Sequence, residues 1–278
     1  MNVHKASKFP QNAAMGYHEL IDIGVNLTHG RFDVDREAVI QRAMDAGVTR
    51  MVLTGVTLTE SSEALEMASS HTGVMAATAG VHPHHASEWT AQSTEALTAL
   101  LAHPNAVAVG ETGLDYCRDF SPRSAQRQAF EAQLAIAGES GYPAFLHQRD
   151  AEDDFLAILR DYRDQISAAV IHCFTGDRAF LHRCLDLDLH VGVTGWICDE
   201  RRGSALRESV PDIPDHRLMI ETDAPFLLPR DMPEKPADRR NEPAFLPHVL
   251  ESVARLRGQD PSRLAEFTAT NSAAFFSL

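Results

Sequence analysis

The sequence predicts a single (β/α)8 barrel, also called a TIM barrel, of the α/β class. Short apolar runs with strand character alternate with amphipathic helical patterns along the chain, and eight strands separated by helices are expected. No linker rich in Pro, Gly or Ser divides the chain, so one barrel fits better than two doubly wound domains. We expect residues 17–278 to form this barrel. Residues 1–16 are expected to be a disordered extension, of which residues 1–14 are dispensable.

The individual elements follow from the spacing of apolar residues. The expected strands span residues 19–26, 50–56, 74–82, a run from 107 that ends at Glu111, 143–147, 168–174, 190–195 and 218–223. The expected helices span residues 33–46, a segment opening at residue 59, 95–102, 124–139, a segment covering 155–162, 179–187, 201–209, 243–256 and 261–275. Apolar side chains at helical spacing mark the inward faces, such as Ile40, Ala43 and Met44 in the first helix and Phe130, Leu134 and Ala137 in the fourth.

The stretch at residues 107–115 is the centre of the functional argument. Its apolar run leads directly into Glu111, which is flanked by Gly110 and Gly113. We expect the strand to stop at glycine and to place Glu111 at its C-terminal end, where barrels position functional residues. The alternative is an ordinary surface glutamate in a loop. Glu111 therefore indicates a functional site only if other apolar strands also end in polar residues of this kind.

Composition restricts the class of protein. The chain of 278 residues is 44% hydrophobic and 23% charged, as in soluble globular enzymes. No apolar run approaches the roughly 20 residues of a membrane span and no secretory signal is recognisable, so we expect a cytoplasmic protein. The four cysteines, Cys117, Cys173, Cys184 and Cys198, are expected to be reduced and structural. A net charge of −14 argues against a protein that coats duplex DNA, although a nuclease holding a few phosphates is not excluded.

Potential metal ligands stand at the ends of several expected strands. They are Asp22, Asn26, His82, Glu111, His147, His172 and Asp223. A single histidine after an apolar run is more often a hydrogen-bonded core residue, but several on successive strands would each need a separate buried partner. Glu111, His147 and His172 therefore form a candidate three-ligand metal site, with Asp223 as a fourth ligand or as the general base. Mixed nitrogen and oxygen ligands favour Zn2+, Mn2+ or Ni2+ over Mg2+.

Eight motifs together resemble the TatD family of metal-dependent deoxyribonucleases in the amidohydrolase superfamily. They occur in family order and cover the chain from about residue 21 to its end. The motifs are Asp-Ile-Gly-Val-Asn-Leu-Thr at 22–28, Ala-Gly-Val-His-Pro-His at 79–84, Gly-Glu-Thr-Gly-Leu-Asp at 110–115, Leu-His-Gln-Arg-Asp at 146–150, Ile-His-Cys-Phe-Thr-Gly at 171–176, Gly-Trp-Ile-Cys-Asp-Glu-Arg-Arg-Gly at 195–203, Ile-Glu-Thr-Asp-Ala-Pro at 220–225 and Arg-Arg-Asn-Glu-Pro at 239–243.

The resemblance implies a barrel that uses a divalent cation, with Mg2+ supporting activity and Mn2+ or Zn2+ as other candidates. It also implies 3′ to 5′ exonuclease action on single-stranded DNA and RNA, and a role in repair of oxidative DNA damage. By motif position, Glu111, His147 and His172 would bind the metal. Asp223 would hold a second ion or act as base, and His82 would contact phosphate or protonate the leaving oxygen.

The first strand departs from the wider family. Most members open with Asp-x-His-x-His, whereas this chain has Asp22, Gly24 and Asn26 in the same frame. Asn26 offers only a weak carbonyl ligand and Gly24 offers no side chain. We therefore expect the ion at Glu111 to be held more firmly than a second ion near Asp223.

Several residues are candidates for substrate binding. Arg201, Arg202, Arg239 and Arg240 follow the seventh and eighth strands, where arginine forks can hold phosphates. Trp196 is placed to stack an unpaired base, and His84 and Arg149 lie in two of the family motifs. The alternatives are solvated arginines in ion pairs and a tryptophan that only packs under its loop. We expect the protein to act on single strands as a monomer.

Two other classes of function compete with a nuclease. One is an amidohydrolase or deacylase for a small substrate, but the bridging lysine usual in that class is replaced by Glu111 at the end of the fourth strand. The other is a weakly catalytic metal-binding scaffold, suggested by the two missing histidines. The retention of Glu111, His147, His172 and Asp223 argues against it.

Overall fold

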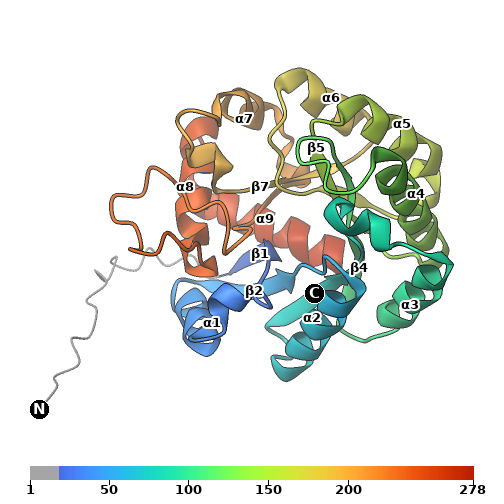
Figure 1. Ribbon diagram of the computed structural model, residues 1–278. Coiled ribbons are helices and arrows are strands. Elements are labelled where there is room, and N and C mark those ends of the chain that lie inside the picture. The colour runs from blue at the N-terminus through green and yellow to red at the C-terminus, as the bar shows by residue number, and fades with distance from the viewer. Residues whose placement is uncertain (1–18) are drawn as a thin grey trace, which may run out of the picture.

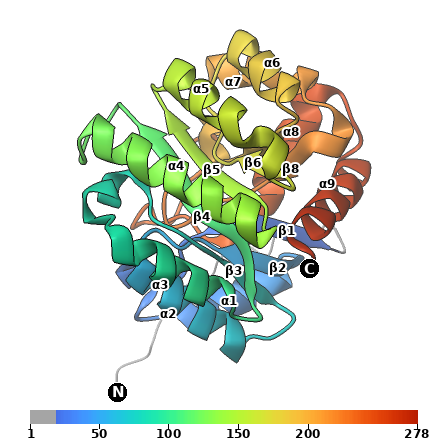
Figure 2. The same cartoon turned by 90° about the vertical axis from the view of Figure 1, so that its right-hand side faces the viewer.

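The computed structural model describes residues 19–278 and confirms the barrel. Within these residues, eight strands form one sheet in the order β1 to β8, and each strand pairs in parallel with the next. Helices surround the strands (Figure 1), and α4 and α5 lie along the outside of β4 and β5 (Figure 2). The expected extension at residues 1–16 lies outside the described residues.

The elements agree with the expected ones to within a few residues at most boundaries. The strands are β1 (Leu20–Val25), β2 (Val48–Leu53), β3 (Met75–Ala79), β4 (Ala106–Asp115), β5 (Ala144–Arg149), β6 (Ala169–Ile171), β7 (His190–Val193) and β8 (Leu218–Ile220). The α-helices are α1 (Arg36–Asp45), α2 (Leu58–Ser70), α3 (Ala91–Leu101), α4 (Arg123–Ser140), α5 (Glu152–Tyr162), α6 (Arg178–Asp186), α7 (Ser204–Ser209), α8 (Leu246–Arg257) and α9 (Pro261–Phe276).

The barrel is completed where the segment after β8 meets the end of β1. The backbone N–H of Asp223 donates to the carbonyl of Gly24 at 2.8 Å, and the N–H of Asn26 donates to the carbonyl of Ala224 at 2.8 Å. Helix α9 packs on both β1 and β8. These contacts bring the first and last motifs of the chain to the same edge of the barrel.

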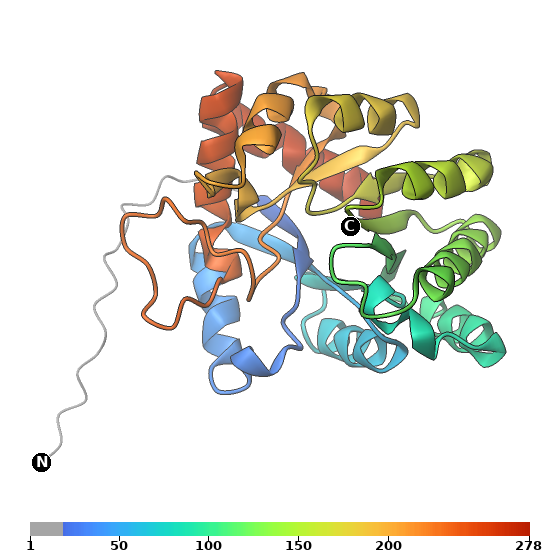
Figure 3. The same cartoon turned by 45° about the horizontal axis from the view of Figure 1, so that its top comes forward.

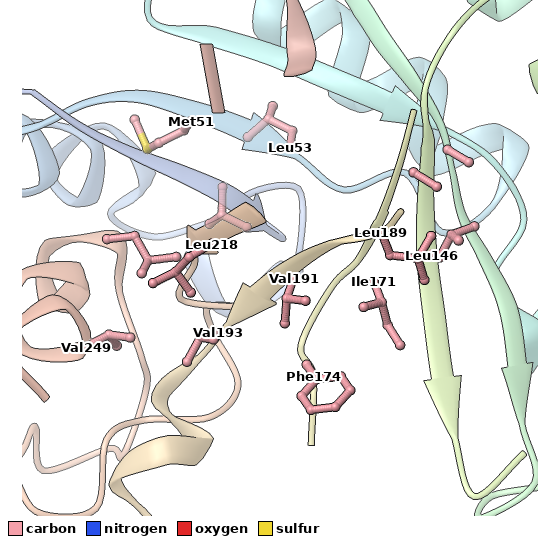
Figure 4. Close-up of a cluster of buried hydrophobic side chains, with 14 of the residues drawn as sticks. Met51, Leu53, Leu146, Ile171, Phe174, Leu189, Val191, Val193, Leu218 and Val249 are labelled. Carbon is pink, nitrogen blue, oxygen red and sulfur yellow. The ribbon is translucent and has the colours of Figure 1, made fainter. Parts of the chain in front are cut away.

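Two apolar layers hold the fold together. The barrel interior is filled by residues from the strands and the end of α9, namely Ile21, Ile23, Val52, Ala108, Phe145, Val170, Met219, Phe275 and Phe276. A larger layer lies between the strands and the surrounding helices, and Figure 4 shows part of it, including Leu146, Ile171, Val191 and Leu218. Full burial of a Leu, Ile or Phe side chain contributes roughly 1.5–3 kcal/mol. Because the interior is packed, function is confined to the ends of the barrel.

Three expectations for individual elements were wrong. Met44 is 42% exposed, so it does not belong to the buried face of α1. Strand β4 does not stop at glycine, because it continues through Glu111 to Asp115 after a register shift between Val109 and Thr112. Helix α7 begins at Ser204, later than expected, so the two arginines before it lie in a loop. The buried face predicted for α4 is confirmed.

No helix in the described part of the chain is long and apolar enough to cross a membrane. The four cysteines all lie within residues 19–278, where none of them forms a disulfide. This agrees with the expectation of reduced thiols. Cys184 and Cys198 are buried, Cys173 is half-buried and Cys117 is exposed.

Candidate metal centre

Glu111 is the centre of a compact group of histidines at the mouth of the barrel. Its carboxylate is buried, and its Oε1 atom lies 2.6 Å from Nε2 of His172 and 2.8 Å from Nδ1 of His147. Nε2 of His82 is 3.3 Å from the same oxygen. Three histidines, from positions in or just after β3, β5 and β6, thus surround one oxygen atom of Glu111 in β4.

Glycines allow β4 to approach β5 closely enough for this arrangement. Gly113 has a φ of 148°, and a Cβ atom there would lie 1.9 Å from the carbonyl oxygen of His147. Gly110 has a φ of 142°, and a Cβ atom there would lie 2.2 Å from the carbonyl oxygen of Phe145. Only glycine fits both positions, because other residues would be strained and would collide with the neighbouring backbone.

His172 connects Glu111 to a second buried carboxylate. It follows β6 directly, and its Nδ1 atom is 3.3 Å from Oε2 of Glu221 while its Nε2 atom faces Glu111. Glu221 also accepts a hydrogen bond from the backbone N–H of Cys173 at 2.5 Å. Glu221 therefore fixes the orientation of the His172 ring, as outer partners of metal-binding histidines commonly do.

Glu221 was not foreseen among the site residues, and its carboxylate lies against two glycines. A Cβ atom on Gly24 would lie 2.3 Å from Oε2 of Glu221, and one on Gly192 would lie 2.5 Å from Oε1. The Glu221 carboxylate thus occupies the space beside Gly24 and Gly192. The available signal was a charged residue directly after the apolar strand β8.

The buried histidines and carboxylates of the site shift each other's pKa values. Burial would raise the pKa of Glu111, but His172 and His82 lower it well below its usual value. Burial would lower the pKa of His172, but Glu111 and Glu221 raise it well above its usual value. The pKa of His147 is also raised, because Asp115 and Glu111 outweigh the effect of burial. Without a metal, protonated histidines compensate the buried carboxylates.

His82 differs from the other two histidines. Burial lowers its pKa to about 4, despite the opposing effect of Glu111, so its ring is neutral near pH 7. A neutral imidazole can bind a metal ion or donate a hydrogen bond. His84 lies beside it with its Nε2 atom 2.7 Å from Oδ2 of Asp115, a carboxylate that was also not foreseen. Asp115 links β4 to this loop.

Asp223 is held next to the group by Asn26. The Nδ2 atom of Asn26 donates to Oδ1 of Asp223 at 3.0 Å. Burial, together with the nearby charges of Glu111 and Glu221, raises the pKa of Asp223 to about 7, although His172 opposes the shift. The first-strand asparagine therefore positions this carboxylate, a role that its sequence position alone did not reveal.

The donor atoms fit a metal ion. Metal-ligating atoms of His82, Glu111 and His147 all lie within 4.8 Å of one another. Nε2 of His147 is buried without a hydrogen-bond partner among the described residues, and the nearest carboxylate oxygen, of Asp115, is 3.6 Å away. Imidazole nitrogens around a carboxylate match the ligand preferences of Zn2+ and Mn2+. Sequence reasoning had grouped Glu111 and His147 with His172. The group whose ligand atoms converge in the structure has His82 as its third member, and His172 contacts Glu111 from outside that group.

Trp196 and its neighbours lie beyond β7. The indole is buried, and the guanidinium carbons of Arg202 and Arg149 lie 4.3 and 5.0 Å from its ring centre. Arg202 also pairs with Asp199 at 2.8 Å, whereas Arg201 is 66% exposed and faces only Glu200 at 3.7 Å. Arginine is therefore concentrated next to an aromatic ring in this loop.

Arg240 is arranged differently from those arginines. Its guanidinium pairs with Asp35 and with Glu242, each at 2.7 Å, and its side chain is only 11% exposed. Arg42 pairs with the same two carboxylates, at 3.1 and 2.8 Å. This network ties the segment after β8 to the start of α1, and phosphate binding by Arg240 stays a prediction.

Comparison with known proteins identifies the family of the chain. Residues 21–277 match the family model described as TatD related DNase. A protein of Erwinia amylovora named 3′-5′ ssDNA/RNA exonuclease TatD is 53% identical over 259 residues, which cover 93% of this chain and 100% of that protein. A protein of Salmonella typhimurium with the same name is 50% identical over 257 residues, covering 92% and 98% of the two chains.

Solved structures show the same architecture. A crystal structure of a TatD homologue from Escherichia coli superimposes with a TM-score of 0.85 at 26% identity, covering 94% of this chain and 99% of that one. A TatD family hydrolase from Entamoeba histolytica superimposes with a TM-score of 0.84 at 24% identity, covering 92% and 97%. Fold and sequence agree, and the chain belongs to the family of TatD related DNases.

Proposed function

We propose that this protein is a 3′ to 5′ exonuclease that hydrolyses phosphodiester bonds of single-stranded DNA and RNA with a divalent cation, Mg2+ in the first place. The support is the name shared by relatives that match more than nine-tenths of the chain. The observation that supports the metal-dependent chemistry is the meeting of three histidines at one oxygen of Glu111. The barrel would act as one catalytic domain in a cytoplasmic monomer that helps to repair oxidative DNA damage.

In this proposal, Glu111, His147 and His172 hold the ion, with His82 next to them. When bound, a divalent ion lowers the pKa of water and neutralises charge on the phosphate. Asp223 would accept the proton from the attacking water, since Asn26 holds its carboxylate next to the group. His82 is neutral near pH 7 and donates a hydrogen bond to a phosphate or leaving oxygen.

The substrate strand would lie across the loops at the mouth. The indole of Trp196 is buried next to the guanidinium groups of Arg202 and Arg149, so we expect it to position these two cations rather than to stack a base. Arg149, Arg201 and Arg202 would neutralise phosphates there, with His84 on the opposite side of the site. These few cations are compatible with a net charge of −14, because an exonuclease holds only a short segment of its substrate.

An end-label experiment tests this function. Single-stranded DNA and RNA labelled at the 5′ end are incubated with the protein, with Mg2+, Mn2+ or a chelator. Stepwise shortening of the labelled strand, dependent on metal and absent in Glu111→Gln, is the expected result. Glu95→Gln on the exposed side of α3 is the matched control and should behave as wild type. Immediate release of the 5′ label as a mononucleotide, or cleavage in the presence of chelator, contradicts the proposal.

A further inference from the structure

A second group of metal-ligand side chains lies outside the centre around Glu111. It consists of Cys198, Asp231 and His248, whose ligand atoms all lie within 4.8 Å of one another. The three residues come from different parts of the chain. Cys198 ends the short helix η4 (Gly195–Cys198) after β7, Asp231 lies in the loop between β8 and α8, and His248 is in α8.

The cysteine is the buried member of this group. Cys198 has no exposed surface, and its thiol donates to Oγ of Ser252 at 3.4 Å. Ser252 lies one helical turn after His248, so the thiol faces the same side of α8 as the imidazole. The sulfur and the imidazole thus point into the same space between η4 and α8.

The other two members face solvent on one side. Nε2 of His248 is 2.6 Å from Oδ1 of Asp231, and their side chains are 25% and 34% exposed. An ion can therefore reach the group from the side of these two residues. Arg255 lies 3.8 Å from Oδ2 of Asp231, whereas His248 contacts Oδ1 of the same carboxylate. The three donors already converge without a bound ion.

We propose that Cys198, Asp231 and His248 form a second metal site that binds Zn2+ or a similar transition-metal ion. Sulfur, nitrogen and oxygen together suit Zn2+ and disfavour Mg2+, which prefers oxygen ligands. Three protein ligands leave a fourth tetrahedral position for water. This site differs in chemistry from the centre at Glu111, where His82, Glu111 and His147 provide no sulfur.

The site would join two loops at the mouth of the barrel. One is the loop after β7, which contains Trp196, and the other is the long loop after β8, drawn in orange at the edge of the molecule (Figure 3). Arg230, next to Asp231, already links the same loops through Asp199 at 3.7 Å and Glu200 at 3.4 Å. A bound ion would hold Trp196 and its neighbouring arginines in place, and removal of the ion would loosen them.

Cobalt substitution tests the site, because a thiolate bound to Co2+ gives a charge-transfer absorption in the near ultraviolet. Metal-free full-length protein is titrated with Co2+ and then with Zn2+. We expect the band to saturate at one equivalent beyond the Co2+ taken up by the Glu111 centre, which contains no thiolate. The band should be abolished in Cys198→Ser and persist in Cys173→Ser, which alters the thiol beside His172. Zn2+ should displace the Co2+, whereas excess Mg2+ should not. No band in the wild type, or a band that persists in Cys198→Ser, overturns the proposal.

A second measurement covers the case in which Cys198→Ser fails to fold. His248→Gln and Asp231→Asn change partly exposed side chains, and both should weaken Co2+ binding by at least about tenfold. Zn2+ should raise the melting temperature of wild type by more than that of His248→Gln, which retains only the Glu111 centre, since an ion that binds only the folded state stabilises it. An equal rise in both proteins would show that Zn2+ acts at the Glu111 centre alone.

Discussion

At the scale of single residues, the metal centre depends on how its buried carboxylates are supported. Glu111 and Glu221 both contact the ring of His172, one at each nitrogen. Glu221 fits only because residues 24 and 192 are glycines. In this chain, the absence of a side chain at Gly24 is therefore coupled to the position of Glu221.

Substitution of Gly24 by alanine tests this coupling. The new methyl group would lie 2.3 Å from Oε2 of Glu221 and would displace the carboxylate from His172. We expect a loss of about 1–3 kcal/mol in the free energy of unfolding, as in other overpacked cores, and a lower pKa of His172. Denaturant unfolding and NMR titration of the metal-free protein measure both. Gly30→Ala is the control, since its new atom would approach only Asp33, at 3.4 Å; equal effects in the two variants would contradict the account.

Asp22 gives a pH-dependent prediction. Burial raises its pKa to about 8, although Thr222 opposes the shift by donating from its backbone N–H at 2.9 Å. Because the pKa of Asp22 is higher in the folded state, the contribution of this group to the free energy of unfolding is fully present below about pH 4. This contribution is lost as the pH rises towards 8. Asp22→Asn stays neutral, so it should lose less stability than wild type between pH 5 and pH 9. Parallel pH profiles of unfolding free energy for the two proteins would refute the raised pKa.

The sequence predicted the positions of these residues better than their partners. The apolar approach to Glu111, His147 and His172 was sufficient to predict that they meet at the barrel mouth, because parallel strands bring their ends together. The contact of Glu221 with His172 was not predictable in this way. The contact depends on side-chain packing between two segments that are 49 positions apart. Apolar spacing along one sequence does not predict which two side chains will meet at that separation.

At the scale of elements, the loops after β7 and β8 differ in what their arginines do. Arg240 is engaged in ion pairs with Asp35 and Glu242, whereas Arg201 is exposed. The sequence placed both arginines after strands but did not distinguish them, since the partner Asp35 lies 205 positions away in the chain. Arg240 therefore has a structural contribution that Arg201 lacks.

Alanine variants of the two arginines separate these contributions. Among residues 19–278, Arg240→Ala leaves Asp35 and Glu242 with Arg42 as their one basic partner, so we expect a loss of about 1–3 kcal/mol in unfolding free energy. Arg201→Ala should leave the melting temperature unchanged and raise KM for single-stranded DNA. Thermal unfolding and steady-state kinetics provide the comparison. An unchanged melting temperature in Arg240→Ala would show that the ion pairs contribute nothing measurable.

At the scale of the whole molecule, the alternation of strands and helices was sufficient to predict the barrel. Strand order, parallel pairing and the buried face of α4 all followed from apolar spacing. The course of β4 beyond Gly110 did not, because its register shift depends on close approach to β5. The barrel then brings motifs from both ends of the chain together at one mouth, where Asn26 meets Asp223.

Metal titration by calorimetry is the most direct test of the central claim, that Glu111, His147 and His172 hold the first ion while Asp223 serves the reaction. Wild type, His147→Ala and Asp223→Asn are each titrated with Mn2+, and turnover is measured on the same samples. We predict that His147→Ala weakens the first ion by at least about tenfold. Asp223→Asn should keep that ion and lose most turnover. Loss of the first ion in Asp223→Asn, or unchanged Mn2+ affinity in His147→Ala, would contradict the account.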